Sequence, residues 1–149
     1  MKTLILLLIP FFAFSQYISV SQDVKLATLG DSEHGYKAPT RDVLIRAGYE
    51  KGYNVFLEYE NANLRPLFQR LNLNAGYTFE VKNFEITLAF GFGVIKRKEN
   101  FWQFNAGVEA GYNIGKFAII AIYEAVQRTD LIRKPIILSL FAGLKFKIS

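Results

Sequence analysis

The residues best suited to catalysis stand together in one short segment, Asp31, Ser32, Glu33 and His34. A histidine oriented by a carboxylate can take the proton of a serine hydroxyl, as in hydrolases and acyltransferases. Residues 30–40, however, are rich in glycine, proline and polar side chains, which predicts a loop without a scaffold to orient such groups. A metal site would need further strong ligands. We therefore predict no enzymatic activity, no metal and no cofactor. A lipid-modifying enzyme centred on His34 is the least favoured alternative.

The remaining charged and polar residues recur at every second position, most clearly between Phe68 and Val94. Residues 68–81 and 84–94 each alternate apolar residues with polar residues or glycine, which is the period of a β-strand. A two-residue turn at Lys82-Asn83 joins them into a hairpin. This register predicts four cross-strand pairs, Val81 with Phe84, Phe79 with Ile86, Tyr77 with Leu88 and Thr78 with Thr87.

The same alternation predicts eight strands. They cover residues 17–29, 41–49, 53–60, 68–81, 84–94, 102–112, 117–125 and 136–148. A three-residue turn at 50–52 would set Tyr49 opposite Tyr53, and the turn before Phe117 would set Tyr112 opposite it. Long and tight connections alternate, as they do in transmembrane barrels. We predict an all-β fold, an eight-stranded antiparallel up-and-down transmembrane β-barrel.

The first residues have the pattern of a secretory signal peptide. Lys2 precedes an apolar run over residues 4–12, and Ala13-Phe14-Ser15 fits the small-x-small rule for cleavage. The length of 149 residues fits one domain. We therefore predict a signal peptide over residues 1–15 and a barrel domain over residues 16–149. The chain has no cysteine, which excludes disulfides and thiolate chemistry.

The two faces of each predicted strand differ in a way that indicates which face is outside. The apolar rows of the second to the eighth strand carry no charge, whereas the polar rows carry the charges and the strand glycines. Those glycines are Gly48, Gly76, Gly91, Gly93, Gly107, Gly111 and Gly143. Glycine suits a crowded interior, and eight strands leave a lumen that side chains can fill. We predict that the apolar rows face lipid and the polar rows face the lumen, the reverse of a soluble barrel.

Length and aromatic content agree with a membrane span. Strands of about 10 to 11 residues, rising about 3.3 Å per residue and tilted by about 40°, span about 25 to 28 Å. Two outward aromatic belts are expected, as at membrane interfaces. The belt near the long loops is formed by Tyr59 and Trp102. The belt near the tight turns is formed by Tyr49, Tyr53, Phe84, Tyr112, Phe117 and Phe146.

In these features the chain resembles the small eight-stranded outer-membrane barrels of Gram-negative bacteria, the OmpA transmembrane-domain and OmpX-like group, over residues 16–149. The resemblance implies an outer-membrane location with both termini periplasmic. It also implies outer-membrane lipids and lipopolysaccharide as surroundings, the barrel-assembly machinery as a partner during biogenesis, and a monomer.

The charged residues of the polar rows predict a buried ion-pair network in the lumen. Its expected members are Asp23, Arg46, Glu58, Glu109, Glu124 and Lys145. Charges in a low-dielectric interior must be paired or hydrated. Paired charges would close the lumen, whereas charges scattered around water would leave a narrow pore for ions or small solutes.

The rim with the long loops is basic. Its basic residues are Arg65, Lys96, Arg97, Lys98, Arg128, Arg133 and Lys134. They could attract lipopolysaccharide phosphates or a cell-surface partner, or they could form a merely solvated rim. Nucleic-acid binding is not expected of an exported barrel. The sequence thus favours an integral outer-membrane barrel with a structural or surface-interaction role, and a narrow pore is the alternative.

Overall fold

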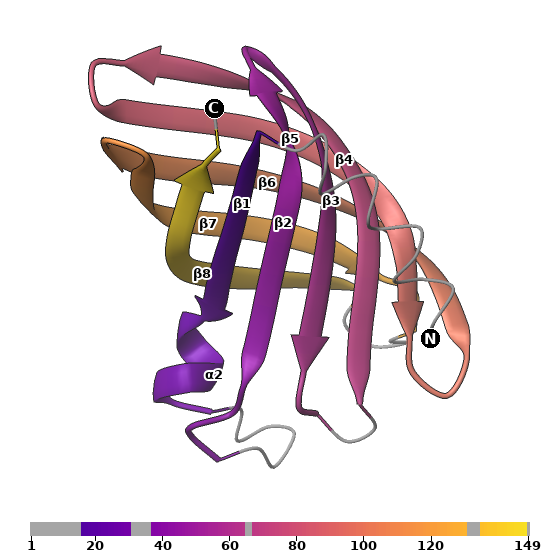
Figure 1. Ribbon diagram of the computed structural model, residues 1–149. Helices are drawn as coiled ribbons and strands as arrows, with labels where there is room; N and C mark the ends of the chain where they lie inside the picture. Colours follow the sequence, from indigo (N-terminus) through magenta and orange to yellow (C-terminus); the bar gives the residue numbers. More distant parts are fainter. Residues whose placement is uncertain (1–15, 31–36, 65–66, 131–134, 149) are drawn as a thin grey trace.

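The structure is a computed structural model that describes residues 16–30, 37–64, 67–130 and 135–148. Eight antiparallel strands follow one another round a closed barrel, and the last strand pairs with the first (Figure 1). The strands are β1 (Tyr17–Asp23), β2 (Asp42–Lys51), β3 (Tyr53–Ala62), β4 (Phe68–Val81), β5 (Phe84–Lys96), β6 (Asn100–Ile114), β7 (Phe117–Arg128) and β8 (Ile136–Lys147). The predicted all-β up-and-down barrel is confirmed. The predicted signal peptide and the segment around His34 lie outside the described residues.

The pairing of the strands fixes the tilt of the barrel. Successive cross-strand partners followed from Tyr17 through all the strands lead to Ile137 on β8, yet Tyr17 pairs directly with Lys147, ten residues further along that strand. An offset of this size in eight strands requires a tilt of about 40°. The front strands β1 to β4 accordingly cross the rear strands β6 to β8 in Figure 1.

The central hairpin has the predicted register. All four expected pairs between β4 and β5 form, from Tyr77 with Leu88 to Val81 with Phe84. Strands β4 to β6 are also the longest, with 13 to 15 residues each. The register of this hairpin could therefore be predicted from the sequence alone.

The other two tight turns are shorter than predicted. Tyr49 faces Val55 rather than Tyr53, and Tyr112 faces Ile119 rather than Phe117. Each prediction of register was wrong by two residues, because the strands continue to the glycines of the turns. Gly52 and Gly115 have φ of 77° and 64°, the left-handed conformation that permits so tight a reversal. A shift of two residues leaves every side chain on its predicted face.

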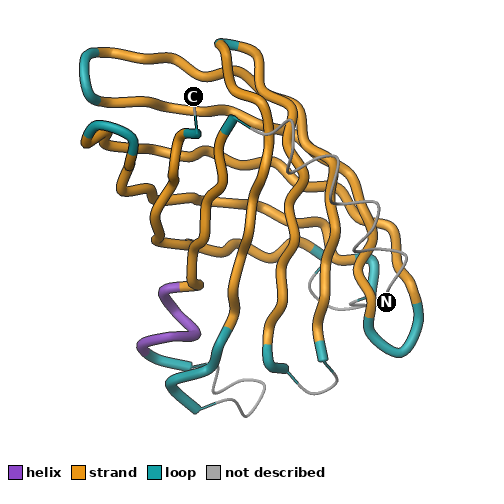
Figure 2. Tube along the Cα trace, viewed as in Figure 1, coloured by secondary structure: helices purple, strands orange, loops and turns teal. Residues whose placement is uncertain are grey.

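The first strand is shorter than predicted. It ends at Asp23 instead of continuing to residue 29, and a short helix, α2 (Val24–Thr28), follows it at the long-loop rim (Figure 2). Asp23 caps this helix, because its Oδ1 accepts a hydrogen bond from the backbone N–H of Leu26 at 2.7 Å. A side-chain cap of this kind competes with strand pairing. The prediction that the strand includes residues 24–29 was therefore wrong.

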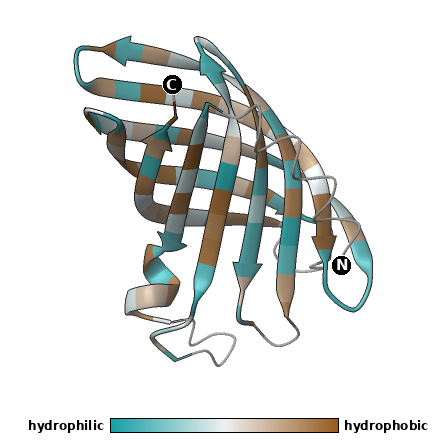
Figure 3. Ribbon diagram, viewed as in Figure 1, coloured by the Kyte–Doolittle hydropathy of each residue, from teal (hydrophilic) through white to brown (hydrophobic). Residues whose placement is uncertain are grey.

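The predicted faces are confirmed. The apolar rows of β4, β5, β6 and β7 are largely exposed on the outside of the barrel, whereas charged and amide side chains are buried inside it. Brown and teal segments alternate along the strands in Figure 3 as a result. No helix in the described ranges is long and apolar enough to cross a membrane.

The lumen contains both apolar and charged side chains. One cluster of buried apolar side chains comprises Leu44, Ala118, Ile120, Ile122 and Phe141, and a second comprises Tyr17, Phe56 and Ala89. Glutamate, arginine, lysine and asparagine side chains are buried beside them. The charged side chains therefore meet in a space that water does not fill freely, and their pairing decides whether the lumen is closed.

Candidate functional site

The candidate site is a chain of ion pairs inside the lumen. Lys145 contacts three of its carboxylates. Its Nζ lies 2.5 Å from Glu109, 2.7 Å from Glu85 and 3.1 Å from Glu50. The three carboxylates come from β6, β5 and β2 and converge on Lys145 of β8. Glu85 also accepts from Nζ of Lys147 at 2.6 Å, which extends the chain to the tight-turn rim.

Arg46 continues the chain toward the middle of the barrel. Its guanidinium lies 3.1 Å from the second oxygen of Glu109 and 2.6 Å from Glu58. Glu109 therefore bridges Arg46 and Lys145. All three side chains are at least 95% buried, so neither cation can exchange its carboxylate for bulk water without a change in the structure.

Arg70 completes the chain near the long-loop rim. It forms two parallel hydrogen bonds to Glu124, at 2.6 and 3.1 Å, and it also contacts Glu58 at 2.9 Å and Glu60 at 2.7 Å. Bidentate arginine–carboxylate pairs of this kind are among the strongest polar contacts in proteins. Arg70 is on β4 and Glu124 on β7, so this pair spans the lumen.

The contacts form one continuous path with alternating charge. From the tight-turn rim to the long-loop rim it runs Lys147, Glu85, Lys145, Glu109, Arg46, Glu58, Arg70 and Glu124. Every strand except β1 contributes to it. Such a path ties opposite walls of the barrel together and leaves its charges paired with one another.

Two aromatic rings support the cations. The guanidinium of Arg46 lies 5.0 Å from the ring centre of Phe56, and Nζ of Lys145 lies 4.9 Å from that of Tyr17. A cation over a desolvated ring gains electrostatic attraction in addition to its ion pairs. Phe56 is an apolar residue in the lumen-facing row of β3, between Asn54 and Glu58.

Three carboxylates at the tight-turn end have the arrangement of a possible metal site. Glu50, Glu80 and Glu85 each offer an oxygen within 4.8 Å of the others. Lys145 already contacts two of these carboxylates, and Lys147 contacts Glu85. The ammonium groups therefore supply the positive charge that a divalent cation would bring.

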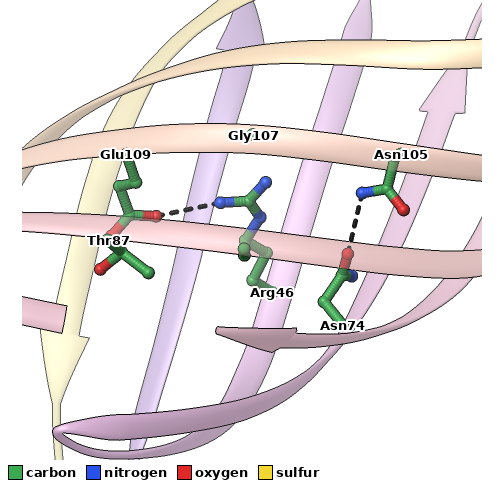
Figure 4. A pocket seen from close by; sticks show the side chains of 7 residues that line it. Arg46, Asn74, Thr87, Asn105, Gly107 and Glu109 are labelled. Carbon is green, nitrogen blue, oxygen red and sulfur yellow. Dashed lines mark hydrogen bonds and ion pairs between the residues drawn. The ribbon is translucent and has the colours of Figure 1, made fainter. Parts of the chain in front are cut away.

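A cavity of about 10 Å³, close to the size of one water molecule, lies in the middle of the lumen. Figure 4 shows Arg46 and Glu109 on one side of it and Asn74 and Asn105 on the other. Asn105 donates a hydrogen bond to Asn74 at 2.8 Å. A space of this size interrupts the packing of the lumen without itself opening a path.

Glycine makes room for these contacts. A Cβ atom at Gly111 would lie 2.7 Å from Cγ of Glu85, which is too close. Lys145, Lys147 and Asn113 all hold the Glu85 carboxylate, so it cannot easily move aside. The predicted role of lumen glycines, to admit larger neighbours, is therefore seen at Gly111.

The long-loop rim holds a second, smaller cluster. Both oxygens of Asp130 accept hydrogen bonds from Arg128 at 2.7 Å, and Arg97 lies 3.7 Å away. The two guanidinium groups also lie over the ring of Phe68, at 4.4 and 5.8 Å from its centre. Burial raises the pKa of the Asp130 carboxyl, but the hydrogen bonds and charge of Arg128 outweigh it, and the pKa lies below its usual value.

The predicted site residues are found in different places. Arg46, Glu58, Glu109 and Lys145 lie together as described, and Glu124 joins them through Arg70. Asp23 is buried at the long-loop end, where its carboxylate caps α2 instead of joining the ion-pair network. Arg97 and Arg128 pair with Asp130, and Lys96 and Lys98 are exposed. Arg65, Arg133 and Lys134 lie outside the described residues.

Several residues of the network were missed at the sequence level. They are Glu50, Glu60, Arg70, Glu85 and Lys147. Arg70, Glu85 and Lys147 stand in the predicted lumen-facing rows, so the alternation already contained the signal for them. Glu50 was placed in a turn, and only the longer β2 brings it into the lumen.

The expected aromatic belts lie on the outside. At the tight-turn rim, the rings of Phe84 and Tyr112 are 5.0 Å apart and those of Phe117 and Phe146 are 5.1 Å apart. At the other rim, Trp102 is 69% exposed. The hydroxyl of Tyr59 accepts a hydrogen bond from Gln69 at 3.0 Å. The outer surface thus has aromatic residues at both ends of its apolar band.

No protein-family model matches the sequence, and no curated protein matches it. Among solved structures, the outer membrane protein Ail of Yersinia pestis, in a phospholipid bilayer nanodisc, shares the fold with a TM-score of 0.59. The superposition covers 89% of this chain and 99% of Ail at 14% sequence identity. At this identity the likeness concerns the fold. The chain therefore has the fold of a small eight-stranded outer-membrane barrel, as the resemblance in its sequence predicts.

Proposed function

We propose that the chain is an integral outer-membrane barrel with a structural or surface-interaction role, whose lumen is closed by its own ion pairs. The observation that carries this proposal is the continuous path of alternating charges from Lys147 to Glu124. A protein that moves solutes needs an open path, whereas this lumen contains paired charges around a cavity of about 10 Å³. The closed interior leaves the outer band and the loops as the surfaces that can act.

The exposed apolar band supports the membrane location. A soluble barrel would expose the charged rows, yet here Phe90, Phe92 and Phe104 are more than half exposed while Glu85 and Glu109 are buried. Apolar surface of this extent is stable against lipid and not against water. With the tight turns on the periplasmic side, both chain ends would also be periplasmic.

Spin labels can test this location directly, because the chain has no cysteine of its own. We expect a nitroxide on Phe90→Cys to be relaxed by oxygen, which concentrates in lipid, and shielded from a water-soluble nickel complex. The matched control is Glu99→Cys in the exposed β5–β6 loop, which should show the opposite preference. Equal access of the nickel complex to both positions would contradict a lipid-facing band.

At the long-loop rim we propose contact with lipopolysaccharide phosphates through Lys96 and Lys98. Both lysines are exposed, whereas Arg97 and Arg128 are engaged by Asp130. Point charges on flexible stems suit phosphate groups. Replacement of both lysines by glutamine should weaken lipopolysaccharide binding to the refolded barrel. The control is Lys37→Gln in the first long loop, and an equal effect of the control would remove this assignment.

A narrow pore is the alternative, and the central cavity is the observation that favours it. The described network contains six glutamates, Glu50, Glu58, Glu60, Glu85, Glu109 and Glu124, and four basic residues, Arg46, Arg70, Lys145 and Lys147. A hydrated form of this lumen would therefore favour cations over anions.

A further inference from the structure

The three tight turns share a feature that the lumen does not explain. Each carries a lysine, Lys51, Lys82 and Lys116, and all three are exposed. The lysines lie at the same rim, because every tight turn reverses the chain at that end of the barrel (Figure 1). Within the described part of the chain, none of the three forms an ion pair, in contrast to Lys145 and Lys147.

An outward aromatic residue accompanies each lysine. The strand that leaves each turn begins with Tyr53, Phe84 or Phe117, and these are 78%, 62% and 55% exposed. Their rings contact further outward rings: Tyr53 lies 5.2 Å from Tyr77, and the other two contact Tyr112 and Phe146. The rim therefore repeats one arrangement three times, an exposed lysine one or two residues before an outward aromatic residue at the edge of the apolar band.

The turn at Lys82 adds a conformational observation. Lys82 has φ of 56°, in the left-handed region, where glycine or asparagine has the lowest cost. Lys82 therefore occupies the turn at a conformational cost, with its side chain exposed.

The carboxylates Glu50 and Glu85 of this rim bind groups other than the three turn lysines. Glu50 accepts from Lys145 and Thr78, and Glu85 accepts from Lys145 and Lys147. Glu80 lies with these two carboxylates on the lumen side. The acidic groups thus gather together on the lumen side of the rim, and the three turn lysines are exposed at the same end of the barrel.

We propose that this rim binds anionic phospholipid headgroups, with the turn lysines contacting the phosphates and the adjacent aromatic residues in the interfacial layer. The inference rests on the proposed membrane location. Lysine stems can extend along apolar surface while the ammonium stays at headgroup level, and aromatic side chains favour the same layer. An acidic soluble partner would use the lysines but would leave the neighbouring rings unexplained.

A local probe can test this. A fluorophore on Ile114→Cys would report on the tight-turn rim, because Ile114 is outward, exposed and opposite Phe117. The barrel is inserted into vesicles that contain phosphatidylcholine and phosphatidylglycerol, with one or the other carrying a nitroxide near the top of its acyl chain. The ratio of the two quenching efficiencies measures the local enrichment of the anionic lipid.

We expect phosphatidylglycerol to be enriched at this probe, by up to about fivefold for a lysine that engages a headgroup. Lys51→Gln, Lys82→Gln and Lys116→Gln together should bring the ratio close to one. The control removes the same charge at the opposite rim, through Lys25→Gln, Lys37→Gln and Arg41→Gln, which are all exposed, and should leave the ratio unchanged. Salt should weaken the enrichment in the parent, because the Debye length falls from about 10 Å at 0.1 M to about 3 Å at 1 M.

The outcomes separate this inference from the proposed function. Absence of quenching by either lipid would show that the rim is not in a bilayer, which contradicts the membrane location. Equal quenching by both lipids in the parent, or enrichment that survives the loss of all three turn lysines, would overturn the headgroup site and leave the membrane barrel intact.

Discussion

Lys145 Nζ lies 2.5 Å from the carboxylate of Glu109, between two walls of the barrel that are 36 residues apart in the chain. The other oxygen of Glu109 contacts Arg46 at 3.1 Å, so one carboxylate holds two buried cations. Removing it would leave both cations in a low-dielectric interior with fewer partners. This bridge is the point at which the closed lumen can best be tested by mutation.

Glu109→Ala should destabilise the barrel by about 3 kcal/mol, the scale for breaking a buried ion pair. The urea midpoint of unfolding in vesicles, followed by the folded band on a gel, would measure the loss. Glu99→Ala is the control, because Glu99 is exposed in a loop. If Glu109→Ala unfolds at the same urea concentration as the parent, the bridge does not stabilise the barrel.

Gly111→Ala should cost about 1 to 3 kcal/mol, because the new methyl group would press against the pinned Glu85 carboxylate. Gly107→Ala is a matched control in the same lumen-facing row of β6. Its Cβ would approach the nearest atom, the carbonyl oxygen of Tyr123, only to 3.4 Å. Comparable unfolding midpoints for the two variants would contradict the close packing around Glu85.

The Asp130 cluster should respond to acid. Its folded pKa lies below the usual value of about 3.9, so its contribution is fully present above that value. It is lost as the pH falls through the lower folded pKa. An NMR titration of the Asp130 carboxyl should show this low midpoint, and Arg128→Gln should raise it. A normal midpoint in the parent would exclude the contact with Arg128.

Asp23→Ala should loosen α2 without weakening the ion-pair path. Loss of a helix cap costs about 1 kcal/mol, so the amide of Leu26, which Asp23 caps, should exchange faster with solvent. Amides in the middle of β5 and β6 should keep their protection in hydrogen-exchange measurements. Faster exchange throughout these strands would instead place Asp23 in the barrel-wide network.

The faces of the strands could be predicted from the sequence, whereas the lengths of two turns could not. A register error of two residues, as at Tyr49 and Tyr112, keeps the alternation intact and therefore leaves no trace in the apolar pattern. The end of β1 was missed for a different reason. Asp23 looks like one more polar residue of a strand, and only its bond to Leu26 identifies it as a cap.

The members of the network were easier to predict than their pairing. Alternation places Arg70 and Glu124 in lumen-facing rows, but they are 54 residues apart and meet only because the barrel closes. Alternation likewise places Phe56 in the lumen-facing row of Glu58, but it gives no sign that the ring lies under Arg46. Closure of the sheet, which local patterns do not encode, thus decides which side chains pair in the lumen.

The most direct test of the closed lumen is the single-channel conductance of the barrel in a planar bilayer, with insertion verified independently. The ion-pair path predicts a silent bilayer in the parent, because the charges from Lys147 to Glu124 contact one another instead of water. A steady conductance would contradict the account and make a narrow pore the leading function.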